Sequence, residues 1–129
     1  GGFLIDIDFG TDGDCDQYVA PAQNLGPHVA ALGMRFYTGE MFPAEYRDDL
    51  YIALHGSWNR SVPVGYRVVR LPFSNGEPAA AVEDFATGWL RSDGSASGRP
   101  VGVTVGSDGA LYVSDDKGGF IYRISYVGE

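Results

Sequence analysis

The sequence contains few of the residues that mark several common classes of protein. Lys117 is its only lysine, and seventeen acidic residues against nine basic ones give a net charge of −8. A surface this acidic repels phosphate backbones, so we do not expect nucleic acid as a partner. No apolar run approaches the ~18 residues that span a bilayer, so we do not expect a membrane as a partner either.

Cysteine is nearly absent, because Cys15 stands alone. A single cysteine excludes an internal disulfide and leaves the redox compartment open. Its neighbours Asp14 and Asp16 disfavour the thiolate, so Cys15 is not a predicted nucleophile. No signal peptide is predicted at the start, although a mature chain would lack one anyway. The sequence also contains no nucleophile elbow, P-loop, dinucleotide fingerprint or zinc spacing.

Glycine and aromatic residues are abundant, and they favour an all-β fold. Nineteen glycines, eight tyrosines and seven phenylalanines suit short strands joined by tight turns. Apolar and polar residues alternate along residues 3–9, "FLIDIDF", as expected for a half-buried or edge strand. Residues 50–54 predict a strand with Leu50, Ile52 and Leu54 facing inward, and residues 66–73 predict the next strand. At 129 residues the chain is expected to be one domain.

Two parts of the chain share one template. "DDLYIALHG…VGYRVVRLPF" and "DGALYVSDDKGGFIYRISY" each contain an acidic turn, a strand, a polar loop, a glycine and an arginine-bearing strand. Repeated antiparallel units of about four strands are typical of a β-propeller. We therefore predict antiparallel four-stranded blades, about two per chain, over residues 20–92 and 93–129.

The second unit ends without a fourth strand. Residues 3–9 have the right character to supply it, and in that case the terminal strand closes the last blade. The alternative is that residues 3–9 form the edge strand of an isolated sandwich. Residues 1–19 otherwise diverge from the repeated template.

Three segments carry a resemblance to a known family. They are "APAQNLGPHVAALGMRFYTG" (20–39), "FPAEYRDDLYIALHGSWNRSVPVGYRVVRLPF" (42–73) and "GRPVGVTVGSDGALYVSDDKGGFIYRI" (98–124). Together and in this order they resemble the C-terminal part of the soluble quinoprotein glucose/sorbosone dehydrogenases. That family consists of six-bladed propellers that oxidise sugars with pyrroloquinoline quinone (PQQ) and calcium.

The resemblance implies a periplasmic or secreted sugar dehydrogenase, with a sugar as the small-molecule partner. A six-bladed ring needs roughly 240 residues at ~40 per blade, so this chain holds about two blades. Either a homotrimer or further blades upstream would complete the ring. The family's catalytic histidine and calcium loops lie in other blades, so a non-catalytic binding or assembly module is the alternative function.

The resemblance also implies which residues contact PQQ, a planar quinone with three carboxylates. Arg99 in "GRPVG" and Arg60 in "HGSWNR" match positions of cationic contacts, and Trp58 and Asn59 neighbour Arg60. His28 in "LGPHVA" matches a residue at the mouth of the site. The alternatives are a solvated Arg99, an Arg60 paired with a nearby acid and a Trp58 that packs on its own loop.

Two histidines and two aspartates near these loops are expected to have structural roles. Neither His28 nor His55 matches the family's catalytic base, although histidine suits proton transfer near neutral pH. We therefore expect both to be hydrogen-bonded loop residues. Asp115 and Asp116 follow a strand and are expected to cap a tight turn.

Three alternating aspartates form a weak candidate metal site. Asp12, Asp14 and Asp16 could surround a hard cation such as calcium. An EF-hand loop needs glycine at its sixth position and glutamate at its twelfth, where this chain has Gln17 and Gln23. A solvated acidic loop is the alternative.

Overall fold

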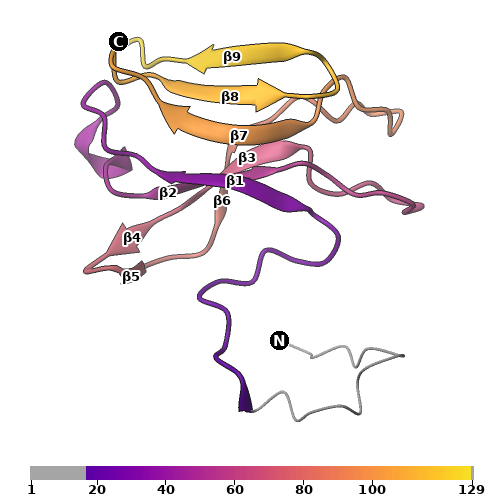
Figure 1. The fold of residues 1–129 in the computed structure, drawn as a ribbon, viewed down its shortest axis with the longest axis horizontal. Coiled ribbons are helices and arrows are strands. Elements are labelled where there is room, and N and C mark those ends of the chain that lie inside the picture. Colours follow the sequence, from indigo (N-terminus) through magenta and orange to yellow (C-terminus); the bar gives the residue numbers. More distant parts are fainter. Residues whose placement is uncertain (1–16, 129) are drawn as a thin grey trace.

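The computed structural model describes residues 17–128, so the predicted strand at residues 3–9 lies outside it. The described part is all-β apart from one 3₁₀ turn, η2 (Ala44–Tyr46), and it contains no helix able to cross a bilayer (Figure 1). The strands are β1 (Ala31–Phe36), β2 (Leu50–Leu54), β3 (Arg67–Leu71), β4 (Phe73–Ser74), β5 (Glu77–Pro78), β6 (Glu83–Ala86), β7 (Pro100–Val105), β8 (Leu111–Asp115) and β9 (Phe120–Ile124).

The strands form two main antiparallel sheets. Sheet 1 has the order β1-β2-β3-β6 and sheet 2 the order β7-β8-β9. A small hairpin, β4-β5, follows β3. The turn that joins its two strands consists of Asn75 and Gly76, both with positive φ. Asn-Gly is the preferred pair for such a turn. Figure 1 shows sheet 2 stacked over sheet 1, with β7 nearest to β1.

The repeated template predicted from the sequence appears in both sheets. Each sheet opens with a six-residue strand whose pairing slips near its start, between Ala31 and Met34 in β1 and between Pro100 and Val103 in β7. The third residue of both β1 and β7 is a glycine. In β1 that glycine, Gly33, permits close packing of the sheets, because an added Cβ would lie 2.5 Å from the Val101 carbonyl oxygen.

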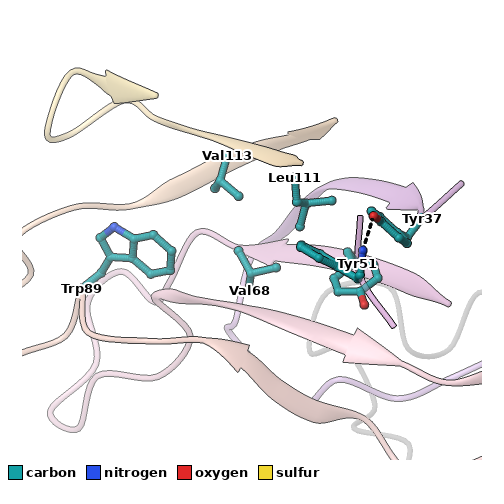
Figure 2. Packing of buried hydrophobic residues seen from close by; sticks show 7 residues of the cluster. Tyr37, Tyr51, Val68, Trp89, Leu111 and Val113 are labelled. Atoms are coloured by element: carbon teal, nitrogen blue, oxygen red, sulfur yellow. Dashed lines mark hydrogen bonds between the residues drawn. The ribbon is translucent and has the colours of Figure 1, made fainter. Parts of the chain in front are cut away.

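Aromatic and aliphatic side chains fill the space between the sheets, as Figure 2 shows. Tyr37 anchors one end of this core. Its hydroxyl donates to the Gly109 carbonyl (2.7 Å) and accepts from the Phe42 N–H (3.0 Å), and its ring stacks on Phe42 with centroids 4.6 Å apart. These bonds satisfy the polar atom of a fully buried ring. The buried residues of this core are Tyr37, Phe42, Tyr51, Val68, Trp89, Leu111 and Val113.

Strand β2 is buried on both faces, not only on the predicted one. Ile52 and Leu54 pack in a second cluster with Val29 and Val69, on the face away from sheet 2. Tyr51, on the opposite face, is fully buried in the core between the sheets. The predicted inward positions are therefore buried, but the second buried face was not predicted, because all five residues of β2 are apolar or aromatic and show no alternation.

A buried ion pair ties the β1–β2 connection to β3. Asp49 is 3 % exposed; its carboxylate accepts from Arg70 Nε (2.6 Å) and from the Phe73 N–H (2.8 Å). The Arg70 guanidinium also lies 4.3 Å from the Tyr46 ring centroid. Burial opposes the charge of Arg70, but the hydrogen bond and the negative charge of Asp49 raise its pKa overall. Each buried charge therefore depends on the other.

Candidate functional site

Several loop segments gather at one end of the two sheets, which we call the loop end. It comprises residues 28–30 before β1, 55–66 between β2 and β3, 87–99 before β7 and 116–119 between β8 and β9. Because neighbouring strands are antiparallel, alternate connections emerge at the same edge. The β2–β3 connection has twelve residues, against four in the equivalent β8–β9 connection. The extra residues contain the sequence "WNR".

Residues 28–30 lie beside the start of the β2–β3 connection. The His55 N–H donates to the Ala30 carbonyl and the Gly56 N–H to the Val29 carbonyl, both at 2.9 Å. His28 is an exposed residue of the turn just before these bonds. The structure therefore places His28 on the same end of the molecule as Trp58, Asn59, Arg60 and Arg99.

The β2–β3 connection has a closed base and an exposed tip. At the base, the Ser57 N–H donates to the Val64 carbonyl (2.8 Å) and the Val64 N–H donates to Ser57 Oγ (3.0 Å). At the tip, Trp58 is 81 % exposed, so its indole does not pack on its own loop. Arg60 Nε donates to the Val62 carbonyl (3.2 Å), and no ion pair involves Arg60 within residues 17–128.

Arg99 lies at the base of this loop rather than in solvent. Its Nε donates to the His55 carbonyl (3.1 Å), and its Nη2 donates to the carbonyls of Gly56 (2.8 Å) and Ser57 (2.9 Å). The guanidinium carbon is 5.2 Å from the centroid of the Tyr66 ring. Arg99 therefore joins the entry of sheet 2 to the loop of sheet 1.

A second link between the sheets pairs His55 with Asp116. Nε2 of His55 lies 3.0 Å from Asp116 Oδ1, which confirms His55 as a hydrogen-bonded loop residue. This partner was not predicted from the sequence, where Asp116 was expected to cap a turn. The signal was present, because His55 and Asp116 follow β2 and β8 directly and are 61 residues apart, the spacing of Leu50 and Leu111. Equivalent positions of stacked repeats lie side by side.

Asp115 does cap the tight turn after β8, as predicted. It is 3 % exposed, and its carboxylate accepts from the N–H groups of Arg99 (2.8 Å), Lys117 (3.0 Å) and Gly118 (2.8 Å) and from the Tyr122 hydroxyl (3.1 Å). Burial raises the pKa of this carboxyl, but the hydrogen bonds outweigh burial and the pKa is lowered overall. Gly98 is needed beside it, because an added Cβ would lie 2.0 Å from Asp115 Oδ2.

Unusual backbone conformations are concentrated at the loop end. His28, Ala30, Asn59 and Tyr66 all have φ between 51° and 62° without being glycine. For a bulky residue such as Tyr66 this conformation costs of order 1–3 kcal/mol and persists only when the surroundings fix it. Residues held in this way are common at ligand sites.

The candidate calcium ligands Asp12, Asp14 and Asp16 lie outside the described residues. Within residues 17–128, no group of three or more histidine, cysteine, aspartate or glutamate side chains could hold a metal ion. A surface hollow at the opposite end is lined by residues 38–41 and 105–109, with Arg35. It contains none of the predicted cofactor-binding residues.

The chain is an all-β repeat protein, because its two stacked antiparallel sheets are built on one template. Its candidate site lies at the loop end, where the loops present charged and aromatic side chains. The family model described as TrAA12-like matches residues 5–127. The chain belongs to the TrAA12-like family.

Curated relatives and solved structures agree with this assignment. An uncharacterized protein of Borreliella burgdorferi is 43 % identical over 85 % of this chain and 29 % of its own length. A pyrroloquinoline quinone-dependent pyranose dehydrogenase of Coprinopsis cinerea is 38 % identical over 88 % of this chain and 18 % of its own length. The holo form of the PQQ domain of a pyranose dehydrogenase from Coprinopsis cinerea superposes with a TM-score of 0.61, at 37 % identity over 78 % of this chain and 27 % of that one.

The chain thus spans less than a third of the relatives that it matches. It is related to PQQ-dependent dehydrogenases, as the resemblance in the sequence implied, and its neighbours are β-propeller-like domains. The family model that matches is TrAA12-like, whereas the resemblance in the sequence was to the glucose/sorbosone dehydrogenases.

Proposed function

We propose that the loop end is the cofactor-side part of a PQQ-dependent sugar dehydrogenase and that the two sheets are successive blades of a propeller. One observation carries the proposal: the exposed Trp58 and Arg60 project from a loop whose base is fixed by hydrogen bonds. The relationship to PQQ-dependent pyranose dehydrogenase supports it. An extracellular location is proposed on the same relationship.

The side chains at the loop end suit PQQ chemically. A planar tricarboxylate needs cationic donors and a flat apolar surface. Arg60 provides a guanidinium with only Nε engaged in its own loop, and Trp58 provides an indole face. The Asn59 amide offers both donors and an acceptor for quinone oxygens, and His28 lies at the edge of the site.

When bound, PQQ supplies a two-electron acceptor for oxidation of a sugar hydroxyl or hydrated aldehyde. The residues of this chain bind and orient it. Arg60 would pair with one of its carboxylates, and Trp58 would provide a flat surface for the ring and exclude water from it. We assign no general base, because the imidazole of His55 is engaged by Asp116 and His28 is an exposed turn residue.

Replacing Arg60 with alanine should weaken PQQ binding about tenfold, because a charge-assisted hydrogen bond at a partly exposed site contributes roughly 1.5 kcal/mol. The measurement is a fluorescence titration with PQQ in a Trp89→Phe background, with and without calcium, following quenching of Trp58. Arg47→Ala is the matched control, since Arg47 is also exposed but lies in the β1–β2 connection at the other end. Equal losses in both variants, or no binding by the wild-type chain, would contradict the proposal.

A second candidate role is assembly, and an exposed apolar face of β1 favours it. Leu32, Met34 and Phe36 alternate along β1 on one face and are 46 %, 59 % and 44 % exposed. We propose that a further sheet packs on this face in the functional protein. That sheet comes either from a second copy of the chain, in a threefold ring, or from another part of a longer chain.

Light scattering after size exclusion distinguishes these two sources. The threefold ring predicts three times the mass of one chain at micromolar concentration, and Met34→Glu should then dissociate it, because the charge would be buried in the interface. A monomer in the wild type would contradict the threefold ring.

A further inference from the structure

Arg99 binds three consecutive carbonyl groups of a neighbouring sheet. Its Nε and Nη2 donate to the carbonyls of His55, Gly56 and Ser57 at 2.8–3.1 Å. These carbonyls lead directly to Trp58, Asn59 and Arg60. A guanidinium presents its donors in one fixed plane, so it can hold several acceptors in one geometry where an ammonium group cannot. Nη1 donates to none of these three carbonyls.

Tyr66 holds the same loop from its other end. Its hydroxyl donates to the Ser57 carbonyl (2.6 Å), so that this oxygen accepts from both Arg99 and Tyr66. An added Cβ on Gly56 would lie 2.6 Å from the Tyr66 ring, which shows how closely the ring covers that residue. The positive φ of Tyr66 (57°) is therefore maintained by contacts on its ring and on its hydroxyl.

We propose that Arg99 is a positioning residue that, together with Tyr66, fixes the base of the β2–β3 loop so that its tip (58–63) is preorganised for a ligand. This role rests on the proposed function of the tip as a PQQ contact. In this role Arg99 acts first on the conformation of the loop, and its effect on the cofactor is indirect. Preorganisation raises affinity because less conformational entropy is lost on binding.

Replacing Arg99 with methionine removes the donors and keeps an unbranched apolar side chain that reaches about as far as the Nε position. We expect the amides of His55, Gly56 and Ser57 to exchange hydrogen at least tenfold faster, while the amides of β8 keep their protection. These three amides donate to Ala30, Val29 and Val64, so they report on the base of the loop directly. Unchanged exchange at residues 55–57 would overturn the proposal.

Trp58 provides a second, spectroscopic readout. The sequence has two tryptophans, and Trp89 is buried in the core between the sheets. In a Trp89→Phe background the fluorescence anisotropy decay therefore reports on the tip alone. Arg99→Met should add a fast local component to the decay. Arg99→Lys, which keeps a positive charge and a donor, should show more of the slow component than Arg99→Met does. If the lysine variant lost the slow component while the methionine variant kept it, the assigned role would be contradicted.

Two further variants separate positioning from general stability and from cofactor binding. Tyr66→Phe removes only the hydroxyl bond to the Ser57 carbonyl and should accelerate exchange at Ser57. It serves as the test if Arg99→Met does not fold. Asp116→Ala breaks the His55–Asp116 pair between the sheets and should leave exchange at residues 56–57 unchanged, since an exposed ion pair contributes little. Both measurements use the chain without PQQ, so failure of PQQ to bind would refute the proposed function and leave this test intact.

Discussion

Replacing Asp115 with alanine should lower the free energy of unfolding by about 3–5 kcal/mol, since each buried donor left unsatisfied costs roughly 1–3 kcal/mol. The carboxylate accepts hydrogen bonds from three backbone N–H groups and from the Tyr122 hydroxyl, and it is almost completely buried. Urea denaturation of the wild type and the variant measures the difference. Because one of the donors is the Arg99 N–H, the variant should also loosen the base of the β2–β3 loop.

Two comparisons test this explanation. Asp116→Ala, at the exposed neighbouring position, should cost less than about 1 kcal/mol. Since the pKa of Asp115 is lowered in the folded protein, its ionised form adds stability above the ordinary carboxyl pKa of about 4, and that stability is lost as pH falls through the lower, folded value. The difference between wild type and Asp115→Ala should therefore be smaller at pH 3 than at pH 7. A difference independent of pH would contradict the role of the ionised carboxylate.

Replacing Asp49 with alanine should destabilise the chain by about 3 kcal/mol. The change leaves the Phe73 N–H without its acceptor. It also leaves Arg70, which lies beside the buried Tyr51, without the carboxylate that accepts from its Nε. Removing one member of a buried pair costs about 3–5 kcal/mol, and Arg70 keeps a weaker contact with Glu83 at 3.4 Å. Urea denaturation again gives the difference.

Asp84→Ala is the matched control for Asp49. Asp84 pairs with Arg67 at 3.0 Å in the same sheet, but both side chains are substantially exposed. We expect a loss below about 1 kcal/mol. Similar losses in the two variants would show that burial of the Asp49–Arg70 pair does not determine its contribution.

Much of the fold could be predicted because strand periodicity is a local property of the sequence. The shared template of the segments that form β2 and β8 indicated antiparallel strands and a repeat. The second buried face of β2 could not be predicted, because a strand that is apolar on both faces has no alternation.

The site was only partly predictable because its bonds join residues far apart in the sequence. The enlarged loop with Trp58 and Arg60 was visible as an insertion relative to the second repeat. The role of Arg99 was not, since its acceptors are backbone carbonyls more than forty residues away, and carbonyls carry no side-chain signal. The His55–Asp116 pair follows from the repeat once equivalent positions are compared.

A titration with PQQ and calcium, followed through the backbone amide chemical shifts of the chain, tests whether the loop end binds the cofactor. We expect shift changes concentrated at residues 28–30, 55–66 and 99, at the end where the enlarged loop lies. Changes confined to the hollow lined by residues 38–41 and 105–109, or no changes at all, would contradict this expectation.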